Sequence, residues 1–258
     1  MRICIVGAGK MGSFLADSMC LLHEVAVFDV NIKKLQYVFN TRRLTTLDEL
    51  REFDPELLIN AVTLKYTLQT FEEVLPYLSP TCMISDIASV KTDLKKFYAT
   101  CGHPYVSTHP MFGPTFANLR ELSKNHAIII SEGDHLGKVF FKDFYGSLNL
   151  NLHEYTFEEH DENMAYALSV PFVSSMVFSA CMRRPDAPGT TFAKHLDTAK
   201  GVLSEDDYLL SEVLFSPHTP EKIQNVISQM EDLLQIIKSK DNALMSSYLT
   251  RLRENINR

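Results

Sequence analysis

The sequence contains no tryptophan, no internal repeat, no low-complexity segment and no Cys-x-x-Cys pair. Its five cysteines are odd in number and scattered along the chain: Cys4, Cys20, Cys82, Cys101 and Cys181. This distribution argues against a disulfide framework or a zinc site and favours reduced thiols in a cytoplasmic compartment. Cys4 and Cys82 fall inside apolar segments, so we expect them to be small core residues.

The sequence also has no long apolar run: none approaches the length of about 20 residues that a membrane-spanning helix needs. A net charge of −7 argues against a general affinity for nucleic acid or for an anionic membrane surface. The chain opens directly on an apolar segment, without a charged and then apolar leader. With 45% hydrophobic and 22% charged residues, the composition is that of a soluble globular protein.

The first part of the chain alternates short apolar runs with helical patterns. Most of the runs are continuously apolar, as expected of strands that are covered on both faces. The strands expected are residues 3–7, 24–29, 57–62, 82–87, 105–109, 127–131 and 149–155, with helices between them such as 67–78 and 91–101. Alternation of this kind predicts a Rossmann-type, doubly wound parallel sheet in an α/β domain.

The pattern changes after about residue 158, because every later periodic segment is helical. Helices are expected over residues 162–182, 190–203, 205–215, 220–240 and 242–255. We therefore predict an α/β domain over 1–157 and an all-α domain over 158–258, with no flexible linker between them. The helical half is too densely apolar for one exposed layer, which predicts a homodimer formed through this domain.

The sequence GAGKMG follows the first strand and opens a helix. Gly7 permits a tight turn, Gly9 lets the backbone approach a pyrophosphate, and Gly12 lets the helix pack closely on the strand. With Lys10 and Met11 between them, these residues predict a dinucleotide site at the helix N-terminus. The alternative is a glycine turn in an ordinary α/β protein.

The second strand ends in Asp29, whose carboxylate would accept a hydrogen bond from the ribose 2′-hydroxyl of NAD. The same carboxylate would repel the 2′-phosphate of NADP. Lys33 and Lys34 follow nearby, so the pattern disfavours NADP rather than excluding it.

Two further strands end in side chains that can carry chemistry. Ser89 follows one strand, where it can cap the next helix or hydrogen-bond a ligand at the carboxyl edge of the sheet. His109 ends the strand before a loop that contains Pro110, Gly113 and Pro114. An imidazole with an ordinary pKa of about 6.5 can accept the proton of an alcohol as hydride leaves its carbon. The alternative for His109 is a residue that only caps the strand.

These motifs, in this order, resemble the prephenate/arogenate dehydrogenase family of tyrosine biosynthesis. The most specific match is STHPMFGP (107–114), and DIASVK (86–91) is similar to the D-x-G-S-V-K of the family with Ala88 in place of glycine. EEHDENMA (158–165) and GVLSEDDYLLSEVL (201–214) extend the resemblance over nearly the whole chain.

The resemblance implies an NAD-dependent oxidative decarboxylation of prephenate to 4-hydroxyphenylpyruvate, or of arogenate to tyrosine. It implies that His109 accepts the proton of the ring hydroxyl and that Ser89 hydrogen-bonds the same hydroxyl. It also implies that His160 lies near the substrate, although a histidine in the first turn of a helix can equally be structural.

Two departures from the family pattern affect substrate recognition. Phe172 stands where many members have a histidine, and Lys194 stands where many have an arginine that binds the substrate. Lysine keeps the positive charge but lacks the two-pronged grip of arginine on a carboxylate. His195 is adjacent and can compensate, and Lys200 completes the cationic cluster expected for a dianionic substrate; the alternative for Lys200 is a solvated helix face.

Two other functions compete with this reading. A β-hydroxyacid dehydrogenase has a similar glycine motif but uses a lysine in the long helix between its domains, and residues 160–182 contain no lysine. A non-catalytic NAD-sensing module would need neither Ser89 nor His109.

Overall fold

The computed structural model describes residues 1–113 and 121–257 and divides into two compact units, Met1–Met164 and Ala165–Arg258. The first unit is built on an eight-stranded sheet with the strand order β3-β2-β1-β4-β5-β6-β7-β8. Its strands are β1 (Arg2–Val6), β2 (Glu24–Phe28), β3 (Arg42–Leu44), β4 (Leu57–Asn60), β5 (Met83–Asp86), β6 (Tyr105–Pro110), β7 (His126–Ile130) and β8 (Asn151–Tyr155). The order and the crossovers are those of a doubly wound α/β fold, as predicted.

The predicted parallel sheet is confirmed except where β7 pairs with β6. β1 to β6 pair in parallel, whereas β7 is antiparallel to β6 and β8 is parallel to β7. A parallel crossover usually contains a helix. The described parts of the β6–β7 connection, residues 111–113 and 121–125, form none, whereas helix α6 (His135–Ser147) joins β7 to β8.

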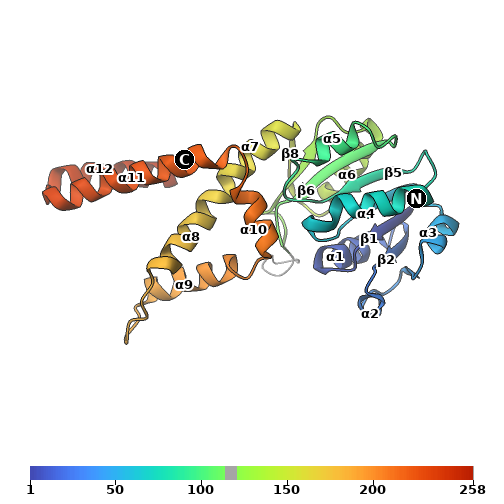
Figure 1. Ribbon diagram of the computed structural model, residues 1–258, viewed down its shortest axis with the longest axis horizontal. Helices are drawn as coiled ribbons and strands as arrows, with labels where there is room; N and C mark the ends of the chain where they lie inside the picture. The colour runs from blue at the N-terminus through green and yellow to red at the C-terminus, as the bar shows by residue number, and fades with distance from the viewer. Residues whose placement is uncertain (114–120, 258) are drawn as a thin grey trace. The chain divides into compact units, whose positions relative to one another are not determined.

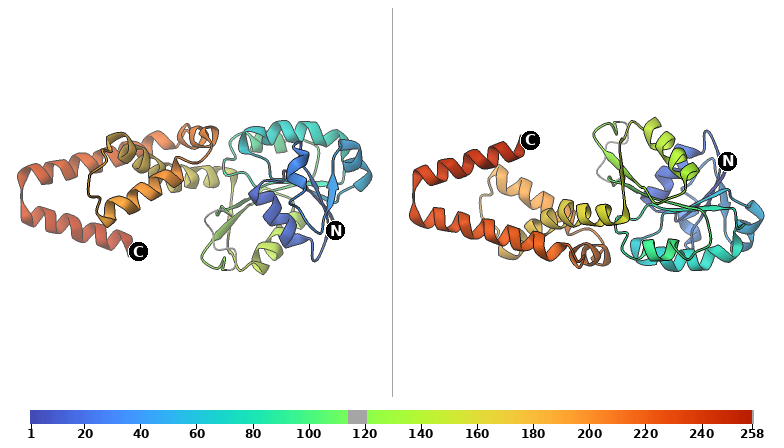
Figure 2. Two further views of the ribbon diagram at one scale, coloured as in Figure 1. Left: turned by 90° about the horizontal axis from the view of Figure 1, so that it is seen from below. Right: turned by 90° about the horizontal axis from the view of Figure 1, so that it is seen from above.

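Helices cover both faces of this sheet (Figure 2). Helix α1 (Lys10–Met19) and α6 pack on one face, where Phe141 and Tyr145 join the strand residues in the main hydrophobic core. On the other face, α4 (Thr67–Val74) contacts α5 (Leu94–Tyr98) through the stacked rings of Phe71 and Phe97, whose centroids are 5.0 Å apart. The strands between these layers are nearly inaccessible to solvent, which explains their continuous apolar runs.

Several short elements were not predicted because they carry weak periodic signals. They are β3, α2 (Ile32–Leu35), α3 (Leu47–Phe53) and a single turn of 3₁₀ helix, Leu64–Tyr66. A second 3₁₀ turn, Leu75–Tyr77, lies inside the predicted helix 67–78. β3 has only three residues, two of them arginine, so it has no apolar run to recognise.

The second unit is helical in its described residues, as predicted. Helix α7 (Phe157–Ala167) contains the division between the units, and the later helices are α8 (Ser169–Cys181), α9 (Thr190–Val202), α10 (Asp207–Leu214), α11 (Thr219–Ser239) and α12 (Asn242–Ile256). α8 contacts α9, α10 and α11, and α11 and α12 follow one another as a helical hairpin (Figure 2). Figure 1 labels these helices. The predicted helix 162–182 is interrupted by a turn at Leu168, three residues before Pro171.

The helical stretch Phe157–Cys181 corrects the expectation about membrane-length segments. It has 25 residues, reaches a mean hydropathy of 1.5, and is only 22% buried over its most apolar window. Length and composition alone therefore qualify it as a membrane span. A single helix of this kind is weak evidence for a membrane location, because apolar helices that are covered in soluble proteins have the same composition.

Candidate active site

His109 lies near the end of β6, where its side chain is 7% exposed. Pro110 ends the strand, and Met111 still donates its backbone N–H to the carbonyl of His126 on β7. The strand pairing therefore fixes the backbone on both sides of His109. Gly113 follows in the loop, whereas Pro114, the last residue of the predicted rigid loop, lies outside the described residues.

The imidazole of His160 lies directly beside that of His109. His109 Nδ1 is 3.0 Å from His160 Nε2, and His160 Nδ1 is 3.0 Å from Oδ1 of Asp161. His160 is fully buried, and each of its ring nitrogens lies within hydrogen-bond distance of a protein group.

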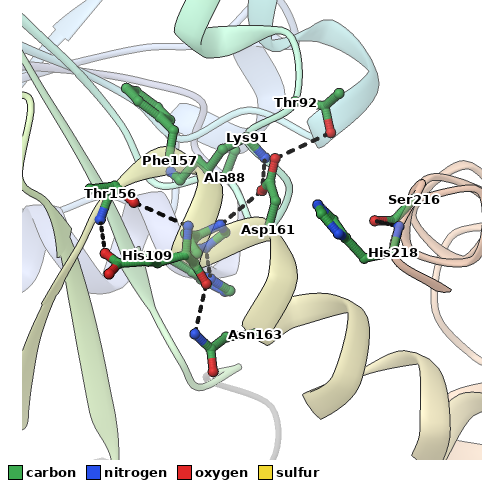
Figure 3. Close-up of polar contacts among 12 residues, drawn as sticks. Ala88, Lys91, Thr92, His109, Thr156, Phe157, Asp161, Asn163, Ser216 and His218 are labelled. Atoms are coloured by element: carbon green, nitrogen blue, oxygen red, sulfur yellow. Dashed lines mark hydrogen bonds and ion pairs between the residues drawn. The ribbon is translucent and has the colours of Figure 1, made fainter. Parts of the chain in front are cut away.

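A capping box explains why α7 begins where it delivers these side chains. The Thr156 backbone N–H donates to the Glu159 carboxylate at 2.8 Å, and the Glu159 N–H donates to Thr156 Oγ1 at 3.1 Å. His160 and Asp161 follow in the first turns of the helix. Figure 3 shows Asp161 in this position, close to Lys91 and Thr92.

A fully buried ion pair between Lys91 and Asp86 holds the backbone next to His109. The Lys91 ammonium donates to Asp86 Oδ1 in a short contact and to the carbonyl of Thr108 at 2.7 Å. The hydroxyl of Tyr98 donates to Asp86 Oδ2 at 2.7 Å. Because Thr108 immediately precedes His109, Lys91 links the end of β5 to the backbone that carries the imidazole.

The backbone of Lys91 also contacts α7. Its N–H donates to Asp161 Oδ1 at 3.2 Å, and the Thr92 hydroxyl lies 3.5 Å from Asp161 Oδ2 (Figure 3). Asp161 therefore joins the loop after β5 to the histidine pair.

Burial is the main influence on the protonation of both histidines. It lowers the pKa of His109 well below the ordinary value of 6.5, and electrostatic interactions with His160 and Lys91 act in the same direction. Burial also lowers the pKa of His160, with a hydrogen bond to Asp161 acting in the opposite direction. Both imidazoles are therefore neutral near neutral pH, and a neutral imidazole can accept a proton.

Ser89 lies half-buried in a bend between β5 and α5. Helix α5 begins only at Leu94, with Asp93 at the N-cap position, so Ser89 does not cap it. The alternative in which Ser89 is a helix cap is therefore wrong. Its predicted hydrogen bond to a substrate hydroxyl stays a prediction.

The glycine motif forms a tight turn between β1 and α1. Gly7 has a φ of +104°, and a Cβ there would meet the carbonyl oxygen of Ala61 at 2.8 Å. A Cβ on Gly12 would lie 1.9 Å from the carbonyl oxygen of Gly7, so only glycine permits this approach of helix to strand. A Cβ on Gly9 would meet nothing within 4 Å, which leaves that part of the backbone open to a ligand. Lys10 and Met11 are the first two residues of α1.

A cavity of about 370 Å³ opens beside this turn. Its lining includes Gly7, Gly9, Asp29 and Lys34, together with residues of α4 and of the 3₁₀ turn before it. Its position at the carboxyl ends of β1 and β2 is the place where an α/β sheet of this order binds nucleotides. The residues present therefore fit the sugar and phosphates of a dinucleotide.

The carboxylate of Asp29 is held by the backbone around the turn. Oδ2 accepts from the Ala8 N–H at 2.8 Å and lies 3.5 Å from the Lys34 ammonium, and Oδ1 accepts from the Asn31 N–H at 2.8 Å. An ionised carboxyl offers about four acceptor positions, so Asp29 retains capacity for a ribose hydroxyl.

The predicted cationic cluster lies on α9 in the second unit. Lys194 and His195 are both exposed, and the His195 ring packs edge-on against Phe178 with centroids 5.9 Å apart. Lys200 is exposed and pairs with Asp197 at 3.4 Å. The contribution of these residues to substrate binding stays a prediction.

Three members of the site were not assigned roles from the sequence: Asp86, Lys91 and Asp161. Asp86 and Lys91 stand five residues apart in DIASVK, and Asp161 follows His160 in EEHD. A charged side chain is fully buried only when it has a partner, so the presence of Asp86 five residues earlier could have indicated a buried ion pair with Lys91. The contact with Asp161 joins residues 70 positions apart, and no local pattern predicts it.

This chain is similar in sequence and fold to known prephenate and arogenate dehydrogenases. The profile of the prephenate dehydrogenase nucleotide-binding domain matches residues 28–148. A probable arogenate/prephenate dehydrogenase of Methanocaldococcus jannaschii is 21% identical over 201 residues, which are 72% of this chain and 44% of that protein. The chain thus spans less than half the length of this curated relative.

Two solved structures share the fold over essentially all of this chain. Arogenate dehydrogenase of Synechocystis superposes with a TM-score of 0.78 at 18% identity, covering 100% of this chain and 99% of its own. Prephenate dehydrogenase of A. aeolicus, solved with hydroxyphenyl propionate and NAD+, gives a TM-score of 0.82 at 16% identity, covering 99% and 96%. The solved structures show that this chain shares their fold, and the profile match and the curated relative show that it is similar to the prephenate/arogenate dehydrogenase family.

Proposed function

We propose that this protein is an NAD-dependent prephenate dehydrogenase that converts prephenate to 4-hydroxyphenylpyruvate and CO2. The observation that carries the proposal is the buried, neutral His109 at the end of β6, held by His160 and by the Lys91 contact to Thr108. Arogenate dehydrogenase is the alternative within the same chemistry. Lys194 and Phe172 support it, because both depart from the family pattern where the substrate is recognised.

His109 and Ser89 act on the ring hydroxyl. Neutral His109 accepts the hydroxyl proton at Nε2 while Ser89 hydrogen-bonds the same oxygen. NAD, when bound at Gly9 and Asp29, supplies the hydride acceptor. As the ring loses hydride and CO2, the electron pair of the broken C–C bond makes the ring aromatic, and His109 returns its proton to the resulting phenolate oxygen.

The cofactor proposal predicts a selective effect of Gly9→Val. The side chain would occupy open space in the free protein, so stability should change little, but it would block the approach of the pyrophosphate. A hydrogen bond to a charged group contributes about 1.5–3 kcal/mol, so the Kd for NAD should rise roughly 10- to 100-fold. Isothermal titration measures it, and an unchanged Kd would remove this turn from the cofactor site.

Gly146→Ala is the matched control for that substitution. Gly146 lies in α6, away from the cavity lining, and a Cβ there also meets nothing within 4 Å. The NAD affinity of this variant should equal that of the unmodified protein.

The predicted homodimer is also part of this proposal. Ile227, Met230, Leu234 and Ile237 are exposed on α11, with spacings of three and four residues that place them along one side of the helix. A second copy of the helical unit is the partner that we propose for this apolar stripe. Sedimentation equilibrium should give twice the 29.3 kDa chain mass, and a monomer would contradict it.

The experiment that tests the proposed activity is NADH formation by the purified protein with NAD, supplied separately with prephenate and with arogenate. Turnover of prephenate is the expected result. Preference for arogenate would select the alternative substrate. No turnover with either, despite demonstrable NAD binding, would favour a sensing module and contradict the proposal.

A further inference from the structure

We infer that Asp161 and His160 are positioning residues that fix the tautomer of His109, so that its Nε2 carries the lone pair that faces the reaction. This inference deepens the proposed function and rests on it for the catalytic role of His109. It gives His160 a role different from the substrate contact that the family resemblance implies.

The Asp161 carboxylate determines which atom donates and which accepts in the hydrogen bonds of both histidines. A carboxylate only accepts hydrogen bonds, so His160, 3.0 Å away, must carry its proton on Nδ1. A neutral His160 then has an unprotonated Nε2, which accepts from His109 Nδ1 at 3.0 Å. Neutral His109 therefore holds its proton on Nδ1 and leaves Nε2 free.

These donor and acceptor assignments require both imidazole rings to be neutral. Besides Asp161, the charged groups that influence the pKa values of the pair are Lys91 and Asp86, which form a buried ion pair with one another. The lowered pKa of each imidazole agrees with this arrangement.

Asp161 is itself fixed by groups that do not titrate. Its Oδ1 also accepts from the Lys91 N–H at 3.2 Å, and its Oδ2 faces the Thr92 hydroxyl at 3.5 Å. Without an acceptor at this place, His160 could hold its proton on either nitrogen. A His160 protonated on Nε2 would require His109 to accept at Nδ1, which puts the proton of His109 on the reacting nitrogen.

The contacts of Asp161 separate the effect of its charge from the effect of its acceptor oxygen. In Asp161→Asn, the amide oxygen can accept from Lys91 and His160 while the amide NH2 donates to Thr92, so the tautomers are kept. Asp161→Leu removes the acceptor. We expect kcat to fall on the order of 10²-fold in the leucine variant, because the base is present in the wrong tautomer, and far less in the asparagine variant.

The direct test is nitrogen NMR of the histidine side chains in the full-length protein labelled with ¹⁵N-histidine, near neutral pH. The expected result is that both His109 and His160 are protonated on Nδ1 in the unmodified protein and in Asp161→Asn. An Nε2-protonated His109, or an unchanged kcat in Asp161→Leu, would overturn the inference.

His153→Gln is a matched control from a second histidine pair. His126 Nδ1 and His153 Nε2 lie 2.9 Å apart on β7 and β8, where His126 is exposed to solvent. This variant should leave kcat and the tautomer of His109 unchanged. Because the NMR measurement needs no turnover, failure of the proposed activity and failure of the tautomer assignment are told apart.

Discussion

Replacement of His109 by asparagine is expected to lower kcat by roughly 10²- to 10⁴-fold, the contribution of a general base. Asparagine is close to histidine in polarity and reach, so its amide NH2 can donate to His160 Nε2 and preserve the buried contacts. It cannot accept a proton from the ring hydroxyl. The Kd for NAD should stay unchanged, because the glycine turn and Asp29 lie on other strands.

The same variant has a distinct expected pH dependence. In the unmodified protein the rate should fall on acidification as His109 becomes protonated, with a midpoint below pH 6.5 because burial lowers its pKa. Asparagine does not titrate, so this acidic limb should disappear. Initial rates of NADH formation across the pH range measure both effects. If the asparagine variant kept the full rate and still lost activity on acidification, His109 would have no part in the mechanism.

Replacement of Lys91 by methionine should destabilise the first unit by about 3–5 kcal/mol, the cost of leaving one partner of a buried ion pair alone. Asp86 would stay fully buried and lose the ammonium group that pairs with it. The carbonyl of Thr108 would lose its donor as well. Urea unfolding followed by circular dichroism measures the change.

Two further variants show whether the loss comes from the buried charge. Lys91→Met combined with Asp86→Leu and Tyr98→Phe removes all three polar partners, and it should recover much of the lost stability. Lys142→Met breaks the partly exposed pair with Glu154 and should cost less than about 1 kcal/mol. Equal losses for Lys91→Met and Lys142→Met would contradict a specific role for the buried pair.

The fold was largely predictable because burial on both faces forces apolar strands and a helix between successive parallel strands. The sheet direction at β7 was not, since helix and strand signals do not report which way a strand enters the sheet. The short strand β3 escaped for another reason: Arg42 and Arg43 are held by pairing with β2 and carry no apolar signal of their own.

The sequence predicted those site residues whose chemistry requires a particular residue type at the carboxyl end of a strand. Gly7, Asp29 and His109 are of this kind, and the structure puts each at the carboxyl ends of the strands. The partners of His109 were harder to foresee, because Lys91 and Asp161 act through contacts between segments distant in the sequence. Only the folded chain brings them to the imidazole.

In the proposed function, this chain couples hydride transfer to decarboxylation. The measurement that tests it most directly is the ratio of CO2 released to NADH formed when the purified protein is given NAD and prephenate labelled in its ring carboxyl group. The account predicts equal amounts of the two products, together with 4-hydroxyphenylpyruvate. NADH without CO2, or neither product with prephenate or arogenate although NAD is bound, would contradict it.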